Sequence, residues 1–76
     1  MQDSEIFKVN LGKRIAQIRK ERGMSQSNLG AALNIDFQSV SRIETGKTNI
    51  SAYTLSKIAK HLEISLDDLL DFDKLN

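Results

Sequence analysis

Residues 24–48, "MSQSNLGAALNIDFQSVSRIETGKT", decide how this chain folds. Apolar residues recur at helical spacing up to Leu33, and a second helical pattern follows almost at once. Only Asn34, Ile35 and Asp36 separate the two patterns. Asn tolerates the left-handed backbone conformation better than most non-glycine residues, so Asn34 can reverse the chain within this short space. The stretch therefore predicts two short helices that cross steeply, with Ile35 filling the angle between them.

The same arrangement of residues marks the start of four helices. An apolar residue precedes a Ser or Asp that can cap free backbone N–H groups, and a second apolar residue follows five positions after the first. The four sets are Met24, Ser25 and Leu29; Ile35, Asp36 and Val40; Ile50, Ser51 and Leu55; and Ile64, Ser65 and Leu69. This repeated pattern predicts helices over residues 26–33, 37–45, 52–62 and 66–71.

One longer helix precedes these four and covers about residues 7–22. Leu11, Ile15 and Ile18 form its apolar face, and Gly23 is its expected C-terminal stop. Its first residue lies anywhere from 4 to 10, and residues 72–76 either continue the last helix or fray. Gly30 lies inside the second helix, where it costs ~1 kcal/mol relative to Ala. Close approach of another backbone would explain that glycine.

The composition limits both the fold and the chemistry. A chain of 76 residues has room for one domain, here residues 1–76 with a core of about 7–71. Proline and strand-length alternation are absent, which predicts an all-α fold. Without Cys and with one His, the chain predicts no disulfide, metal or cofactor. No apolar run approaches a membrane span of ~20 residues, and the N-terminus lacks a signal-peptide pattern, so we expect a cytoplasmic protein.

Basic and acidic side chains are distributed unevenly. Residues 1–60 contain ten Lys and Arg against five Asp and Glu, a balance of +5. Residues 61–76 contain one Lys against five Asp and Glu, a balance of −4, which leaves the whole chain at +1. This asymmetry is either the mark of a polyanionic partner on one side of the molecule or ordinary surface charge, and composition alone leaves both open.

Counted from Gln26, the stretch has a small residue at its fifth position and a turn-forming residue at its ninth, Gly30 and Asn34. With its apolar positions, this pattern resembles the helix-turn-helix motif of the Cro and phage-repressor (XRE) family. The resemblance covers about residues 10–70. It implies a five-helix, lambda-repressor-like domain that binds double-stranded DNA as a sequence-specific transcription regulator. Small phage repressors and restriction–modification controller proteins are similar, which implies a bacterial or phage protein at the nucleoid.

The helix over residues 37–45 has an outer face suited to reading bases. At ~100° per residue, Gln38, Ser41 and Arg42 point away from the inward-facing Val40 and Ile43. Gln pairs well with adenine and Arg with guanine, whereas Lys and Glu would be expected on a face that is only solvated. Phe37 lies at the flank of this face, where it either contacts a thymine methyl group or folds back onto the core.

The resemblance also implies phosphate contacts at the start of the second helix and in the loop after the third. The expected residues are Ser25, Gln26, Ser27, Thr45, Lys47, Thr48 and Asn49, with Arg14 of the first helix adding reach. Free N–H groups at a helix N-terminus, small polar side chains and a lysine suit an anion. By the same resemblance, Arg19 and Glu44 form an ion pair that braces the motif.

One such domain reads about half of a palindromic operator, so we expect a homodimer. Apolar residues near the C-terminus exceed what a short terminal helix needs to bury, which predicts the dimer contact there, with Tyr53 or His61 possible alongside. These residues are Leu66, Leu69, Leu70, Phe72 and Leu75, and the alternative is that they complete the core. No small-molecule ligand is evident.

Two other functional classes are alternatives to a DNA-binding regulator. The same fold could serve as a protein-binding module, such as an antitoxin, with DNA binding secondary. The readable side chains of residues 37–45 argue against that as the main role, and only residues 1–9 and 72–76 are spare for a partner. An enzyme is not expected, because His61 is the only His and the aspartates of residues 67–73 lack the spacing of a metal loop.

Overall fold

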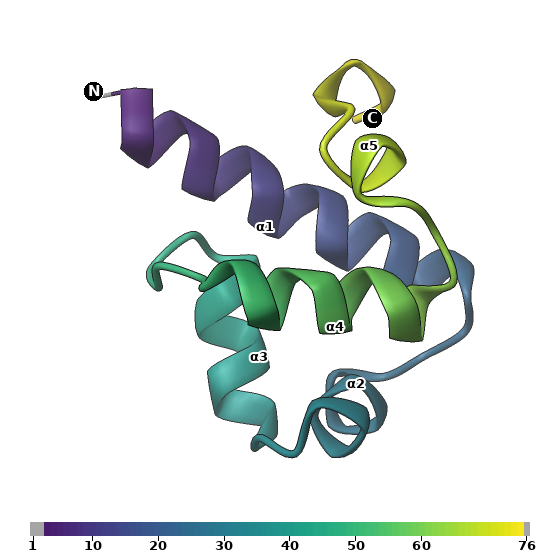
Figure 1. The fold of residues 1–76 in the computed structure, drawn as a ribbon. Helices are drawn as coiled ribbons and strands as arrows, with labels where there is room; N and C mark the ends of the chain where they lie inside the picture. The colour runs from purple at the N-terminus through teal and green to yellow at the C-terminus, as the bar shows by residue number, and fades with distance from the viewer. Residues whose placement is uncertain (1–2, 76) are drawn as a thin grey trace.

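The computed structural model describes residues 3–75, so residues 1, 2 and 76 of the expected domain lie outside it. Its elements are α1 (Asp3–Glu21), α2 (Gln26–Leu33), α3 (Phe37–Glu44), α4 (Ala52–Leu62), α5 (Leu66–Leu69) and the 3₁₀ helix η1 (Phe72–Lys74). No strand occurs within this range, which confirms the predicted all-α fold with five α-helices. In Figure 1, α1 runs along the upper part of the molecule, α4 lies in front of it, and α2 and α3 lie below.

Two helix boundaries differ from the prediction by two residues or more, while α1 and α3 each end one residue early, at Glu21 and Glu44. α1 begins at Asp3, before the earliest expected residue, and Asp3 and Glu5 place negative charge in its first turn, where the helix dipole favours it. α5 ends at Leu69, two residues early. The Asp71 side chain accepts a hydrogen bond from the Asp73 N–H at 3.2 Å, and this cap starts the separate helix η1. Residues 72–75 therefore neither continue α5 nor fray.

The four predicted helix caps are confirmed. Each capping side chain accepts a hydrogen bond from the backbone N–H three residues later, at 2.7–3.1 Å. The caps are Ser25, Asp36, Ser51 and Ser65. At α2 the bond is reciprocal, because the Asn28 side chain accepts from the Ser25 N–H at 2.9 Å. These local bonds satisfy N–H groups that a helix start leaves without an intrahelical partner.

Four helices are each followed by a residue in the left-handed backbone conformation, where the chain changes direction. Gly23 and Gly46 serve α1 and α3, with φ of 71° and 76°. Asn34 and Glu63 serve α2 and α4, with φ of 60° and 59°. Glu63 is the unusual choice, because a side chain other than Gly or Asn is strained in this region.

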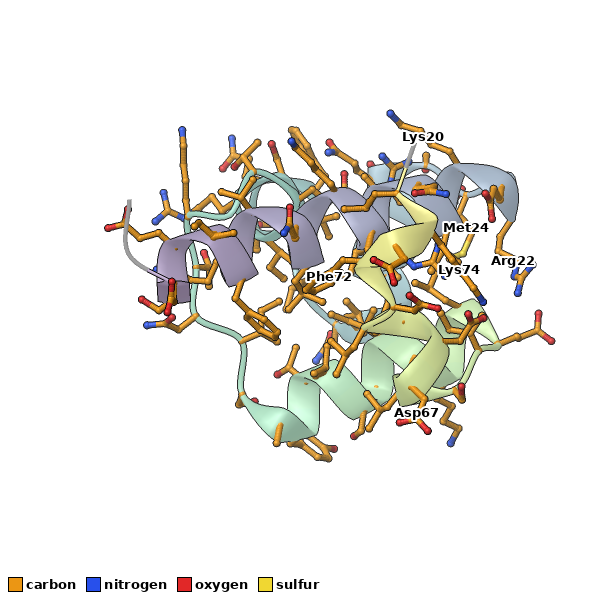
Figure 2. All side chains as sticks on the ribbon, turned by 90° about the horizontal axis from the view of Figure 1, so that it is seen from above. Lys20, Arg22, Met24, Asp67, Phe72 and Lys74 are labelled. Carbon is orange, nitrogen blue, oxygen red and sulfur yellow. The ribbon has the colours of Figure 1, made fainter. Side chains whose placement is uncertain are left out.

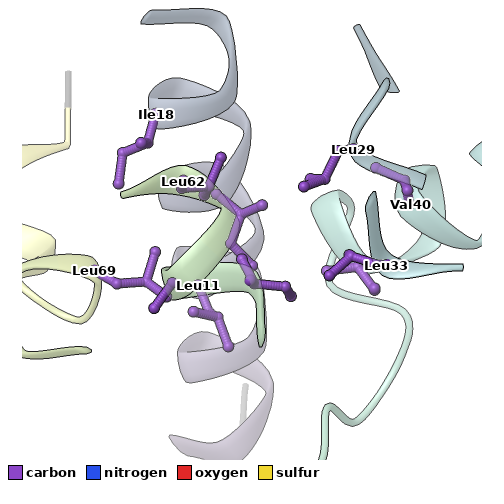
Figure 3. Packing of buried hydrophobic residues seen from close by; sticks show 11 residues of the cluster. Leu11, Ile18, Leu29, Leu33, Val40, Leu62 and Leu69 are labelled. Carbon is purple, nitrogen blue, oxygen red and sulfur yellow. The ribbon is translucent and has the colours of Figure 1, made fainter. Parts of the chain in front are cut away.

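The core takes residues from every α-helix. Its eleven buried members are Leu11, Ile15, Ile18, Leu29, Leu33, Val40, Ile43, Ile58, Ala59, Leu62 and Leu69. Figure 3 shows side chains of α1 and α4 meeting those of α2, α3 and α5. The periodicity of the sequence predicted the α1 contribution, Leu11, Ile15 and Ile18, and these three are buried. The core thereby holds α3 through Val40 and Ile43 and leaves its opposite face uncovered.

Two arginines of α1, and Arg22 just after it, donate to backbone carbonyls elsewhere in the fold. Arg14 donates to the Asp68 carbonyl of α5 at 2.9 Å, and Arg22 donates to the Leu62 carbonyl of α4 at 2.9 Å. Arg19 donates to the Met24 carbonyl at 2.8 Å. The carbonyls of Leu62 and Asp68 lie in the last turns of α4 and α5, where carbonyls lack intrahelical donors, so a guanidinium stabilises them by hydrogen bonding and by charge. Three of the ten basic side chains in the first 60 residues are therefore bonded within the fold, and two of them, Arg14 and Arg19, are buried.

The C-terminal tail is fastened along α1. The ring of Phe72 meets the ring of Phe7 edge-on at a centroid distance of 5.6 Å. Gln17 donates to the Lys74 carbonyl at 3.0 Å, and the Lys74 ammonium pairs with Asp68 and holds the pKa of that carboxyl below its ordinary value. Figure 2 shows Phe72 and Lys74 on the turn that lies over α1. The helices within residues 3–75 are too short or too polar to cross a membrane.

Candidate nucleic-acid interface

The turn between α2 and α3 sets the direction of α3. Asn34 adopts the expected left-handed conformation, and the Ile35 N–H donates to the Gly30 carbonyl at 2.8 Å. A Cβ at Gly30 would lie 2.7 Å from the Ile35 carbonyl oxygen, so only glycine leaves room for this turn. The predicted close approach at Gly30 is confirmed, and the approaching backbone belongs to the turn itself. Ile35 is half-buried and packs against the core, as predicted for the residue in this angle.

The outer face of α3 is open to solvent. Gln38 and Arg42 are exposed, Ser41 is half-buried, and Phe37 is 53% exposed. Phe37 therefore does not fold back onto the core. These four side chains provide amide, guanidinium, hydroxyl and aromatic groups without a carboxylate. Such a set matches the hydrogen-bonding and apolar features of base edges in the major groove.

A buried carboxylate joins the three helices around the motif. Glu44 of α3 accepts two hydrogen bonds from Arg19 of α1, at 2.6 Å from Nε and 3.0 Å from Nη2. The same carboxylate accepts from the Gln26 amide of α2 at 3.0 Å. The side chains of Arg19 and Glu44 are only 8% and 6% exposed. The structure thus brings the expected pair together and adds Gln26, which sequence reasoning had assigned only to phosphate.

The crossing of α1 over α3 depends on a glycine that sequence reasoning missed. A Cβ at Gly12 would lie 2.5 Å from the carbonyl oxygens of both Ile43 and Glu44. The two backbones therefore meet at the end of α3 that carries Glu44. The available signal is a glycine inside a strong helical pattern, which is unfavourable without such a contact.

The expected phosphate-binding residues have different surroundings. Ser25, Ser27, Lys47 and Asn49 are exposed, and Thr48 is half-buried. The hydroxyl of Ser25 serves as the cap of α2, and the half-buried Gln26 is turned toward Glu44.

One of these assignments is wrong, and a second residue is engaged within the fold. The Arg14 side chain is 5% exposed and bonded to Asp68, so it cannot reach a phosphate. The Thr45 hydroxyl donates its proton to the Ser41 carbonyl at 2.9 Å, because that carbonyl lies one helical turn back at the end of α3. The Thr45 hydroxyl is thus bonded within α3 in this structure, and its assignment to phosphate stays a prediction.

The structure also corrects the expected dimer contact. Leu69 is fully buried and belongs to the core, because α5 packs this side chain inward. Leu70 and Phe72 are half-buried against the core, and Leu75 is half-buried as well. Of the five expected residues, Leu66 is the exposed one, at 41%. The alternative that these residues complete the core thus holds for Leu69.

Charge around the turn also favours the observed start of α3. The Asp36 carboxylate accepts from the Ser39 N–H at 2.7 Å, and this bond lowers the pKa of Asp36 below its ordinary value. Asp36 therefore stays ionised at neutral pH and keeps its negative charge at the N-terminus of α3, where it interacts favourably with the helix dipole.

Comparison with known proteins identifies the class that this fold and surface define. The helix-turn-helix family HTH_3 matches residues 15–69, which is more than half of the chain. The chain therefore belongs to this family of DNA-binding transcriptional regulators, and the predicted XRE-type relationship is confirmed. The family consists of regulators and not of enzymes.

The similar proteins include controllers of restriction–modification systems. The control protein C.MunI of a Mycoplasma species is 36% identical over 70 residues, covering 90% of this chain and 95% of that protein. The controller C.AhdI of Aeromonas hydrophila has 29% identity and a TM-score of 0.82, covering 90% of this chain and 99% of that one. The biofilm regulator SinR, solved in complex with DNA, has 39% identity and a TM-score of 0.71, covering 80% of this chain and 98% of that one.

Proposed function

We propose that this regulator binds a palindromic operator as a homodimer and reads it by placing α3 in the major groove. The observation that carries the proposal is the outer face of α3. Gln38, Arg42 and Phe37 are exposed there, while the opposite face of the helix is locked into the core and Glu44 is tied to α1 and α2. A rigidly held helix with such an outer face can present the same donors and acceptors to every base pair it meets.

Contacts with the phosphates of the DNA backbone orient α3. At the start of α2, Gln26 and Ser27 offer backbone N–H groups to a phosphate, and Ser25 and Ser27 add small hydroxyl side chains. After α3, Lys47, Thr48 and Asn49 offer a cation, a hydroxyl and an amide. These contacts carry no base preference themselves but fix the register in which Gln38 and Arg42 meet the bases.

Operator symmetry and exposed apolar side chains on α1, α4 and α5 support dimerisation. Leu66 at the start of α5 is 41% exposed, and Tyr53 at the start of α4 is 72% exposed. Ile6 and Phe7 of α1 add exposures of 42% and 45%. A second copy is the natural cover for such surface, and it would set the two α3 helices ~34 Å apart, one turn of DNA.

Selection of bound sequences from a random duplex pool tests this proposal. The expected outcome is an enriched site with two inverted half-sites centred about one helical turn apart. Sedimentation in the absence of DNA should give a dimer at tens of micromolar. A pool that returns no enriched sequence contradicts the proposal, whereas an enriched site without symmetry contradicts the homodimer alone.

The alternative role as a protein-binding module is not favoured, because the similar proteins are named as controllers and transcriptional regulators. A regulator of this kind would act on DNA in the cytoplasm of a bacterium or of a phage-infected cell.

A further inference from the structure

A groove of about 600 Å³ lies between the outer surface of α1 and the end of the C-terminal tail. Leu75 borders this α1–tail groove from the tail, and Figure 2 shows Lys20 close to where the C-terminal turn reaches α1. Helical spacing places the floor of the groove opposite the buried face of α1, so the groove opens to solvent. The floor consists of Lys13, Ala16, Gln17, Lys20 and Glu21.

One hydrogen-bond acceptor in the α1–tail groove has no donor. The side-chain Nε2 of Gln17 donates to the Lys74 carbonyl at 3.0 Å and lies 3.5 Å from a carboxylate oxygen of Glu21. Both partners are acceptors, which fixes the orientation of the amide and leaves Gln17 Oε1 over. In the part of the chain that the structure describes, this oxygen is the one buried side-chain nitrogen or oxygen atom without a hydrogen-bond partner. A buried unsatisfied acceptor is costly, so the binding of an N–H donor to Gln17 Oε1 is favoured.

Charged groups of both signs in the α1–tail groove also lack partners. Within residues 3–75, no salt bridge involves Lys13, Lys20 or Glu21. The two lysines lie one turn to either side of Gln17, and Glu21 lies one turn after it. Because both lysine side chains are exposed and flexible, they can move aside to admit a ligand to Gln17 Oε1. The groove therefore offers two ammonium groups and a pair of neighbouring acceptors, Gln17 Oε1 and the Glu21 carboxylate.

The remaining lining residues are apolar or already satisfied. Ala16 and Leu75 present methyl groups to the groove. Glu44 lines the end of the groove next to α3, but its carboxylate already accepts hydrogen bonds from Arg19 and Gln26. A ligand with a single charge would leave the opposite charge of the groove unmatched, and a ligand without an N–H group would leave the buried acceptor unsatisfied.

We propose that the α1–tail groove binds an α-amino acid with an apolar side chain. The ammonium group of the ligand donates to Gln17 Oε1 and to the Glu21 carboxylate, and its carboxylate pairs with one of the two lysines. Its side chain packs on Ala16 and Leu75. Such a zwitterion matches both signs of charge, the unsatisfied acceptor and the apolar surface at once. The sequence alone does not indicate this site, because Leu75 and the Lys74 carbonyl reach α1 only in the folded chain.

Titration of the isotope-labelled protein with L-leucine, followed by NMR in the absence of DNA, tests this proposal. Saturable shifts are expected for the backbone amides of residues 13–21 and of Leu75. N-acetyl-L-leucine lacks the ammonium group and L-leucinamide lacks the carboxylate, so each should bind about three- to tenfold more weakly than L-leucine. The absence of shifts at tens of millimolar L-leucine, shifts confined to other parts of the fold, or equal affinities for the three compounds would overturn the proposal.

Variants of the groove assign the two ends of the ligand. Glu21→Gln should remove the preference for L-leucine over N-acetyl-L-leucine, and Gln17→Met, which has no amide oxygen, should reduce it. Joint substitution of Lys13→Gln and Lys20→Gln should remove the preference for L-leucine over L-leucinamide. The control is Lys60→Gln, an exposed position of α4 outside the groove, which should keep both preferences.

Each preference is a ratio of two affinities within one variant, so a general change in structure would not remove one preference and spare the other. Wild-type preferences in the groove variants, or loss of both preferences in the Lys60→Gln control, would overturn the assignment.

Discussion

Gly12→Ala should destabilise the domain and tilt α3. The added Cβ would start 2.5 Å from the carbonyl oxygens of Ile43 and Glu44. Carbon–oxygen contacts of this type normally lie at 3.3–3.6 Å, so the two backbones must separate by roughly 0.8 Å or more. No side chain can rotate away to relieve the overlap, because the obstructing atoms belong to the backbone.

The net effect follows from two opposing magnitudes. Overpacking typically costs 1–3 kcal/mol, and a backbone obstruction belongs at or above the upper end of that range. Ala returns about 1 kcal/mol of helix propensity. We therefore expect a net loss of about 2 kcal/mol, which corresponds to a fall in Tm of roughly 8–16 °C for a domain of this size.

Urea denaturation followed by circular dichroism measures this loss. The adjacent Lys13→Ala is the control, because Lys13 is exposed and its truncation should change stability by less than about 0.5 kcal/mol. Operator affinity of Gly12→Ala should fall even where the protein remains folded, since the carbonyls that move belong to the end of α3. A variant as stable as the wild type would refute the close crossing of α1 and α3.

Three further predictions follow from the polar contacts and the strained turn. A double-mutant cycle with Arg19→Met and Glu44→Gln, measured by urea denaturation, tests the buried ion pair. Either single substitution should lower the free energy of unfolding by about 3 kcal/mol, and the coupling energy between the two should exceed about 1 kcal/mol. Zero coupling would contradict the bracing role. Glu63→Gly should raise the free energy of unfolding by about 0.5–1 kcal/mol, seen as a higher Tm, because left-handed strain is removed; a lower Tm would contradict this. The hydrogen bond from the Ser39 N–H lowers the pKa of Asp36 in the folded protein. The contribution of Asp36 to the free energy of unfolding is therefore complete above the ordinary pKa of 3.8, and it is lost as the pH falls through the lower pKa of the folded state. Asp36→Asn should flatten this acid dependence in unfolding measured from pH 6 to 2, and an unchanged profile would contradict the assignment.

The sequence predicts the helices well where their signals are local. The caps Ser25 and Asp36 and the turn residue Asn34 act on backbone atoms within a few positions, so their roles are independent of the rest of the fold. Apolar periodicity likewise fixed which face of α3 would be buried. The extension of α1 to Asp3 was missed because Ile6 and Phe7 are largely exposed there and the apolar pattern weakens.

Assignments that depend on distant contacts could not be made from sequence. Whether Arg14 faces DNA or the interior depends on where α5 ends, since its partner is the Asp68 carbonyl 54 positions away. The environment of Leu69 could not be predicted either, because helical spacing alone does not say whether a terminal helix packs on the core or on a second chain. Gln26 and Gly12 gain their roles from the end of α3, which reaches them only through the tertiary fold.

The central claim is that exposed side chains of α3 read bases while the loop after it binds phosphate. Affinities of Arg42→Ala and Lys47→Ala for the selected operator and for single-base variants of it, each at two salt concentrations, test this claim directly. Arg42→Ala should lose about 1–3 kcal/mol on the operator and should no longer discriminate at one position of each half-site. Lys47→Ala should weaken every duplex alike and reduce the salt dependence by about one phosphate contact. Full base preference in Arg42→Ala would contradict the account.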